Sequence, residues 1–345
     1  MNNLKYKTGK RNLITDVEGV SVGNSQDAIL QSGVTVLKLS KKFRASAEIH
    51  GGAPATREMH LLNPQNTVQY IDSVILSGGS VFGLGSASSI VDILKKEQRG
   101  YKISKSNIHV PIVPTAAIYD VNEESANTIS STIYSNLAEK AYYKSGKNFE
   151  LGNYGAGYGA KSGLLKGGQG SASVVTPEGA VIGAISIVNS IGSALIPNTK
   201  LLYSSLYEMD DELGNVLQSN SDILKEYKYN PKLIEDSKLL DQDGGRQNTT
   251  ISVIATNISL NKSQLNYIAK MSFSGLSRAI RPSGTILDGD LTIVISNCEV
   301  ETEITDKMLI SLGSLSADTL TRAIGRAIYS AKSLNNIIAY SDIIK

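Results

Sequence analysis

The sequence has little of what several common classes of protein require. It contains one cysteine, Cys298, and no tryptophan among its 345 residues. A single cysteine excludes an intramolecular disulfide, which favours a reducing compartment and therefore a cytoplasmic location. The chain also lacks an uninterrupted run of about 18 apolar residues, and no apolar stretch follows the basic residues at its N-terminus. We therefore expect neither a membrane-spanning helix nor a secretory signal.

Charge and histidine content argue against nucleic-acid, membrane and metal binding. The net charge is only +2, with 19% charged residues, so the composition favours neither nucleic acid nor an anionic membrane as a partner. The three histidines, His50, His60 and His109, have no spacing suited to metal ligands. We expect no metal site and no nucleic-acid or membrane partner.

Glycine, in contrast, is abundant. The chain has 31 glycines, and two glycine-rich segments occur at residues 78–89 (GGSVFGLGSASS) and 166–173 (KGGQGSAS). Backbone N–H groups in such segments can bind an anion. Neither segment matches the glycine patterns of phosphate or dinucleotide sites. Close packing of turns against helices is the simpler interpretation, and no cofactor is expected.

The apolar pattern predicts strands and helices in blocks, which suits stacked layers of sheet and helix. Runs rich in β-branched residues indicate strands, and apolar residues at helical spacing indicate helices. The predicted strands are residues 33–39, 73–76, 109–114, 171–175, 180–188, 249–255 and 291–296, and the predicted helices are residues 88–96, 262–272 and 307–332.

A polar stretch between residues 200 and 247 interrupts this pattern and predicts an exposed, partly helical connection. A long irregular stretch inside a compact protein needs a reason. Asn248-Thr249-Thr250 lies where this connection meets the strand TTISVIA. An ordinary strand start is the simplest interpretation of the tripeptide, and cleavage of the chain is the functional one.

Cleavage between Asn248 and Thr249 would turn a weak nucleophile into an effective one. A threonine hydroxyl needs a nearby base, and a new chain terminus supplies its own α-amine with a pKa of roughly 7.7–8.0. Before cleavage the same hydroxyl could attack the Asn248 carbonyl in an N→O acyl shift. One nucleophile would thus serve both self-cleavage and substrate hydrolysis.

Asp288-Gly289-Asp290 is the second candidate for chemistry, because two carboxylates flank a glycine just before a buried strand. Asp-Gly is also a favoured turn pair, so a simple turn remains open as an interpretation. In the functional interpretation one carboxylate orients the hydroxyl or amine of Thr249. Lys166 or Asn189 could stabilise the oxyanion, because an ammonium or an amide N–H suits that role.

Together these motifs resemble the P1 family of self-processing peptidases, which comprises L-aminopeptidase/D-esterases, β-aminopeptidases and nylon-oligomer hydrolases. The resemblance covers most of the chain in the family's order, except residues 200–247 and the end of the last helix. The matching segments are residues 14–23 (ITDVEGVSVG), 32–36 (SGVTV), 51–58 (GGAPATRE), 76–84 (LSGGSVFGL), 110–114 (VPIVP), 155–159 (GAGYG), 166–173, 248–255 and 288–290.

The resemblance implies a single domain with a four-layer α/β/β/α sandwich like that of N-terminal-nucleophile hydrolases. It also implies cleavage into residues 1–248 and 249–345, which stay together. Serine often replaces aspartate at position 288 in the aminopeptidases with a serine nucleophile, so Asp288 weakens the transfer of their specificity. By motif match the site residues are Thr249 as nucleophile, Asp288 and Asp290 as its acidic neighbours, Asn189 at the oxyanion, and Tyr119 and Lys166 beside them.

We therefore expect a self-processing N-terminal-threonine hydrolase that cleaves amide bonds in small peptides or peptide-like oligoamides. Similar proteins form tetramers or larger assemblies, so a homo-oligomer of processed chains is expected. One alternative is an acyltransferase of the ornithine acetyltransferase type, which shares a related fold and a self-processing threonine. The other is a non-catalytic ligand-binding or assembly protein that is never cleaved.

Overall fold

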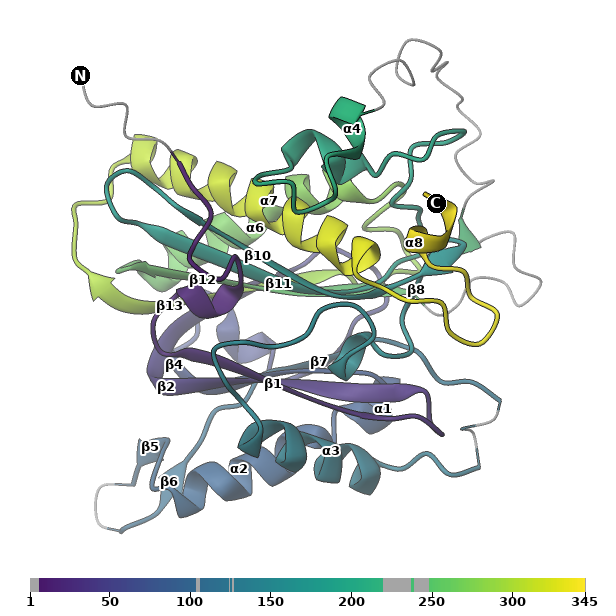
Figure 1. Cartoon of the computed structure of the whole chain (residues 1–345). Coiled ribbons are helices and arrows are strands. Elements are labelled where there is room, and N and C mark those ends of the chain that lie inside the picture. Colours follow the sequence, from purple (N-terminus) through teal and green to yellow (C-terminus); the bar gives the residue numbers. More distant parts are fainter. Residues whose placement is uncertain are drawn as a thin grey trace.

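The computed structural model describes residues 6–103, 106–123, 125, 127–219, 237–238 and 248–344. Helices lie on both outer faces and strands lie between them, as Figure 1 shows. One face carries α6 (Lys262–Ala279) and α7 (Asp306–Tyr329), and the other carries α1 (Ser80–Gly83), α2 (Ser86–Lys96) and α3 (Ser131–Tyr143). The predicted four-layer α/β/β/α arrangement is confirmed.

The two strand layers share one long strand, β2 (Ser32–Ile49). Residues 34–38 and 43–44 of β2 pair with β4, and residues 44–49 pair with β13. The strands therefore form one nine-stranded sheet of order β10-β11-β12-β13-β2-β4-β7-β3, with β1 paired to β2. The other bounds are β1 (Val20–Asp27), β3 (Ala55–Arg57), β4 (Tyr70–Ser77), β7 (Thr115–Ala117), β10 (Gly168–Val175), β11 (Val181–Asn189), β12 (Thr249–Ile258) and β13 (Leu291–Val300).

The short elements complete the described chain. Two ribbons lie outside the main sheet, β5 with β6 and β8 with β9. Their bounds are β5 (Tyr101–Lys102), β6 (His109–Val110), β8 (Lys161–Ser162) and β9 (Leu165–Lys166), and the short helices are η1 (Ile14–Asp16), η2 (His60–Leu62), η3 (Gly155–Gly157), η4 (Tyr203–Tyr207), α4 (Val216–Ser219) and α8 (Tyr340–Ile343). None of the helices in this part of the chain combines the length and apolar character needed to cross a membrane.

Strand β12 shows how the sequence builds this core. Its side chains alternate between faces, as a strand requires. Ile251 and Val253 join the apolar cluster between the two strand layers, whereas Ile254 and Ile258 pack in the cluster beneath α6 and α7. Because both faces of β12 are buried, nearly every position in it is β-branched or small.

Most predicted elements are confirmed, but one strand prediction was wrong. Of residues 109–114 only His109–Val110 pairs as a strand. Pro111 and Pro114 have no N–H to donate to a ladder, and the N–H of Ile112 instead donates to Asp72 Oδ2 at 3.0 Å. The N–H groups of Asp72 and Ile75 in β4 donate to the carbonyl oxygens of Ile112 and Pro114 at 2.9 and 3.1 Å, so the segment lies along β4 without completing a regular ladder.

The predicted exposed connection also needs correction in its first part. Leu201, Leu202 and Leu213 are buried, and Leu202 and Leu213 belong to the cluster beneath α6 and α7. This part of the polar stretch therefore packs on the protein instead of extending into solvent. The rest of the prediction, over residues 220–236 and 239–247, lies outside the described residues.

Candidate active site

Three neighbouring strands bring the predicted site residues to one edge of the sheet. Strand β11 ends at Asn189 and β12 begins at Thr249, and these two residues face each other in the antiparallel register. Strands β12 and β13 are parallel, so both begin at this edge. A further bridge pairs Asn248 with Asp288. The topology thus unites residues that lie far apart in sequence.

Thr249 lies against the peptide bond that precedes it. The side chain is buried, with 3% of its surface exposed, and its hydroxyl donates to the carbonyl oxygen of Asn248. The N–H of Gly289 donates to the same oxygen at 3.0 Å. A donor in this position can stabilise negative charge on that oxygen if the carbonyl carbon is attacked.

Gly289 has to be glycine for this contact to form. A Cβ atom at this position would lie 2.6 Å from Thr249 Oγ1 and 2.7 Å from the carbonyl oxygen of Ala53. Both distances are shorter than the contacts that a Cβ atom makes in proteins, so a side chain at this position would displace the hydroxyl of Thr249. The middle residue of Asp-Gly-Asp therefore gives the nucleophile room and donates to the adjacent carbonyl.

Asp288 is fully buried and accepts hydrogen bonds on both carboxylate oxygens. Its Oδ2 accepts from the N–H of Thr285 at 3.1 Å and from the Thr285 hydroxyl at 2.7 Å. Its Oδ1 accepts from the N–H of Ile191 at 3.3 Å. The bonds to Thr285 close a turn over residues 285–288, and the bond to Ile191 fixes the carboxylate beside the end of β11. The same aspartate therefore forms the turn and belongs to the candidate site.

Asp290 is held just as firmly beside the start of β12. Its Oδ1 accepts from the N–H of Thr250 at 2.6 Å, and its Oδ2 accepts from the N–H of Gly284 at 2.8 Å. Burial, reinforced by the negative charge of Asp288, raises the pKa of Asp290 to about 7. A carboxyl group with this pKa can take up and release protons near neutral pH.

The segment at residues 50–53 holds the backbone of the acidic pair. The N–H groups of His50 and Gly51 donate to the Asp290 carbonyl at 2.7 and 3.0 Å, and the Ala53 N–H donates to the Asp288 carbonyl at 2.8 Å. A Cβ at Gly51 would lie 2.2 Å from the Asp288 carbonyl oxygen. This close approach explains the first glycine of the GGAPATRE motif, and a Cβ at the second, Gly52, would lie 2.7 Å from the Ile286 carbonyl oxygen.

The side-chain amide of Asn189 is fixed by contacts on both of its polar atoms. Its Nδ2 donates to the carbonyl oxygen of Tyr119 at 3.0 Å. Its Oδ1 accepts from the N–H of Lys161 at 2.9 Å and from Lys238 Nζ at 3.1 Å. Because two donors face Oδ1 and an acceptor faces Nδ2, the orientation of the amide is unambiguous. Neither Lys161 nor Lys238 was predicted from the sequence as a site residue.

Tyr119 and Lys166 border the site in different ways. The Tyr119 side chain is 38% exposed, and Tyr119 contacts Asn189 through its backbone carbonyl. Lys166 is buried, and its Nζ donates to the carbonyl oxygens of Gly157, Ala160 and Gly167 at 3.2, 2.7 and 2.9 Å. Burial lowers the pKa of Lys166 to about 7, although the charge of Asp120 opposes this shift.

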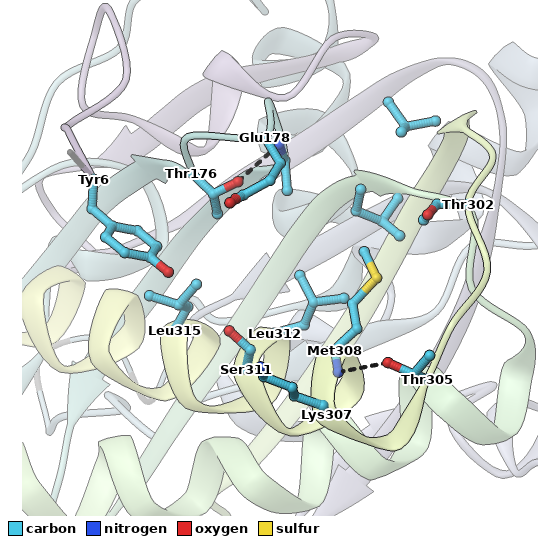
Figure 2. A pocket seen from close by; sticks show the side chains of 13 residues that line it. Tyr6, Thr176, Glu178, Thr302, Thr305, Lys307, Met308, Ser311, Leu312 and Leu315 are labelled. Carbon is cyan, nitrogen blue, oxygen red and sulfur yellow. Dashed lines mark hydrogen bonds between the residues drawn. The ribbon is translucent and has the colours of Figure 1, made fainter. Parts of the chain in front are cut away.

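A separate cavity of about 400 Å³ lies at the other end of β12. Figure 2 shows its lining, which includes Met308, Leu312 and Leu315 of α7. Ile258, at the far end of β12 from Thr249, also lines it, and a strand of this length spans roughly 30 Å. This cavity is therefore remote from the candidate site. Within the residues that the structure describes, no three His, Cys, Asp or Glu side chains are grouped to hold a metal ion.

The fold is that of the Ntn-hydrolase class of aminopeptidases. A Burkholderia sp. beta-aminopeptidase superposes with a TM-score of 0.70 at 17% identity, covering 97% of this chain and 91% of its own. An L-aminopeptidase D-Ala-esterase/amidase from Ochrobactrum anthropi, described as a new variant among the Ntn hydrolase fold, gives 0.69 at 19% identity, with coverages of 97% and 93%.

The chain belongs to peptidase family S58, whose family model matches residues 12–338. An uncharacterized aminopeptidase of Mycobacterium leprae (strain TN) is 32% identical over 95% of this chain and 93% of its own length. A 6-aminohexanoate-oligomer endohydrolase of Kocuria sp. (strain KY2) is 25% identical over 85% of this chain and 77% of its own length. The family resemblance predicted from the sequence is confirmed, and the protein is a hydrolase of the peptidase type.

Proposed function

We propose that the protein is a self-processing N-terminal-threonine hydrolase that cleaves amide bonds of small peptides or peptide-like oligoamides. One observation carries the proposal. The Thr249 hydroxyl contacts the Asn248 carbonyl group, whose oxygen also accepts from the Gly289 N–H at 3.0 Å. A nucleophile next to a carbonyl whose developing charge has a fixed donor is suited to attack it.

Self-cleavage begins when Thr249 Oγ1 attacks the carbonyl carbon of Asn248. The C–N bond then breaks, the hydroxyl proton passes to the released nitrogen, and an ester joins Asn248 to Thr249 Oγ1. Water hydrolyses this ester to a carboxylate on Asn248 and a free hydroxyl on Thr249. We assign the relay of this proton to Asp290, which lies beside the start of β12 through its bond to the Thr250 N–H and whose pKa is raised to about 7.

Turnover repeats the attack on a substrate. The α-amine of Thr249 accepts the hydroxyl proton and delivers it to the leaving amine, and water then hydrolyses the acyl-enzyme ester. Asn189, which faces Thr249 in the register, donates from Nδ2 to the oxyanion. Asp288 and Asp290 hold the hydroxyl and the amine. Tyr119 and Lys166 assist from the border of the site.

The two proposed pieces are interleaved, which supports their staying together after cleavage. Strands β12 and β13 belong to the smaller piece, residues 249–345. They pair on one side with β11 and on the other with β2, which both belong to residues 1–248. Separation would therefore expose two strand edges and the apolar faces beside them. We further propose that the processed protein is a cytoplasmic homo-oligomer that needs no cofactor.

Substrates of two kinds follow from the relatives. The mycobacterial protein is named an aminopeptidase, and the Kocuria protein is named an endohydrolase of 6-aminohexanoate oligomers. Incubation of the purified protein with aminoacyl p-nitroanilides and short oligoamides should release amines, whereas the Thr249→Ala variant should release none. Acyl exchange between an acetylated amino acid and a free amino acid, with negligible hydrolysis, would instead identify an acyltransferase. Inactivity in both assays would favour a non-catalytic role.

A further inference from the structure

A chain of hydrogen bonds connects the buried Lys166 to Asn189 through one peptide group. Lys166 Nζ donates to the carbonyl oxygen of Ala160 at 2.7 Å. The N–H of the same peptide group, which belongs to Lys161, donates to Asn189 Oδ1 at 2.9 Å. The ammonium charge of Lys166 therefore acts on the Asn189 amide through the Ala160–Lys161 peptide, in addition to Lys238 Nζ, which donates directly to Asn189 Oδ1 at 3.1 Å.

A second peptide group continues the chain to a buried carboxylate. Asn189 Nδ2 donates to the Tyr119 carbonyl at 3.0 Å. The N–H of that peptide group belongs to Asp120, whose buried carboxylate accepts from the Gly79 N–H at 2.7 Å. The Asn189 amide thus lies between a lysine, one peptide group away on its Oδ1 side, and an aspartate, whose own backbone begins at the peptide group on its Nδ2 side.

We propose that Lys166 and Asp120 are positioning residues that hold the Asn189 amide in the orientation required for its role at the oxyanion. Hydrogen bonds aligned head to tail strengthen one another, most of all in a buried site. Positive charge at the Oδ1 end of the amide and negative charge at the Nδ2 end hold it in one orientation. The inference rests on the proposed function, in which Asn189 stabilises the oxyanion.

The surroundings of Asp120 support this role. Its Oδ1 accepts from the N–H of Gly79 at 2.7 Å. A Cβ at Gly78 would lie 2.4 Å from its Oδ2, and one at Gly159 would lie 2.9 Å away. Glycines therefore leave just enough space for the carboxylate. The glycine-rich segment that could bind an anion contacts the protein's own Asp120.

The charges of the pair also depend on each other. Burial raises the pKa of Asp120 to about 6 while the charge of Lys166 opposes the rise, and burial lowers the pKa of Lys166 to about 7 while the charge of Asp120 opposes the fall. Loss of the Lys166 charge would therefore raise the pKa of Asp120 further, and loss of the Asp120 charge would lower the pKa of Lys166 further. Both single substitutions should affect Asn189 in the same direction.

The chain offers a matched control for each substitution. Lys262 is also buried, and its Nζ also donates to three backbone carbonyls, those of Leu61, Asn66 and Val68 at 2.7, 3.1 and 2.8 Å. Asp72 is a buried carboxylate that accepts the Ile112 N–H at 3.0 Å. Lys262→Met and Asp72→Asn therefore cause comparable structural losses at positions with no described bond to Asn189.

The test compares Lys166→Met with Lys262→Met and Asp120→Asn with Asp72→Asn. For an aminoacyl p-nitroanilide, Lys166→Met and Asp120→Asn should each lower kcat about tenfold with KM nearly unchanged, a fraction of the 10²–10³-fold cost of losing an oxyanion donor. The two controls should keep kcat. In the uncleaved Thr249→Ala background, NMR should show the Lys161 N–H and Asn189 Nδ2 proton resonances moving only in the two test variants.

Kinetics and resonances that match those of the controls in both test variants would overturn the inference while leaving the hydrolase function intact. A wild-type protein that hydrolyses no amide would overturn the proposed function, and the NMR comparison would still test the hydrogen-bond chain. If Lys166→Met does not fold, Asp120→Asn carries the test, because asparagine retains the shape of the side chain and loses only its charge.

Discussion

The N–H of Gly289 donates to the carbonyl oxygen of Asn248 at 3.0 Å. The residue between the two aspartates therefore contacts the bond that we propose is cut. Asp-Gly-Asp can be interpreted from sequence as a turn or as an acidic pair, and the structure shows that both descriptions hold. The turn brings the Gly289 N–H to the Asn248 carbonyl, and the carboxylates flank the start of β12.

Replacing Gly289 with alanine should block self-cleavage. The added Cβ would lie 2.6 Å from Thr249 Oγ1, so the hydroxyl would move away from the Asn248 carbonyl. We expect Gly289→Ala to remain one polypeptide on a denaturing gel under conditions in which the wild type is cut. Gly146→Ala is the control, because its Cβ would lie 3.7 Å from the nearest atom. Normal cleavage of Gly289→Ala would show that the hydroxyl position is unimportant.

Replacing Asn189 with alanine should lower kcat by about 10²–10³-fold, the usual cost of one lost oxyanion donor. KM should change little, because the bond strengthens only as charge develops in the transition state. Asn297→Ala is the control, since Asn297 is a buried amide whose Nδ2 donates to the Glu18 carbonyl at 2.9 Å. Steady-state kinetics should be measured for both variants. If Asn189→Ala has the same kcat as Asn297→Ala, Asn189 does not stabilise the oxyanion.

Asp290 should make the folded state less stable as pH rises. Its pKa is raised from 3.8 to about 7 by burial and by the charge of Asp288. Between these values the folded protein binds more protons than the unfolded chain, so the free energy of unfolding falls, by at most about 1.4 kcal/mol per pH unit for one group. The test measures the free energy of unfolding in urea for Thr249→Ala and for Thr249→Ala/Asp290→Asn. Between pH 4 and 7 the variant that retains Asp290 should lose stability relative to the asparagine variant. A constant difference would contradict this assignment.

A buried ion pair should help to hold the two proposed pieces together. Arg322, 2% exposed at its side chain, contacts Glu212 with Nε and Oε1 at 2.5 Å. Glu212→Gln would leave a buried guanidinium without its counter-charge, a change that costs about 3–5 kcal/mol. The exposed pair of Lys41 and Glu299, at 3.5 Å, also joins the two pieces, and Glu299→Gln should cost only about 0–1 kcal/mol. Thermal unfolding of the processed protein measures the stability lost in each variant. Equal losses in Glu212→Gln and Glu299→Gln would contradict the larger role of the buried pair.

Local sequence was enough to predict most strands and helices of this fold. Strand β12 could be predicted because β-branched residues follow Thr249 without interruption, and α6 because its apolar residues recur at helical spacing. Asn261 caps α6 by accepting from the N–H of Gln264 at 2.9 Å, a local signal for the start of the helix. The layers themselves followed from the family resemblance.

The contacts within the site depend on long-range register, which local sequence does not encode. Asn189 faces Thr249 only because β11 and β12 pair in one register across a long connection. Lys238 belongs to a polar stretch without an apolar pattern, so its contact with Asn189 had no sequence signal. Asp120 was not predicted as a site residue, because a single aspartate after Tyr119 resembles an ordinary loop residue. Lys166 was predicted to assist at the oxyanion, but the backbone contacts that link it to Asn189 were not predictable.

The most direct test of the central claim is the intact mass of the purified protein after prolonged incubation, together with the N-terminal sequence of each polypeptide. We predict two polypeptides from the wild type, the smaller beginning at Thr249, and one full-length polypeptide from Thr249→Ala. A wild-type protein that remains a single full-length polypeptide, or one cut at another bond, would contradict the account.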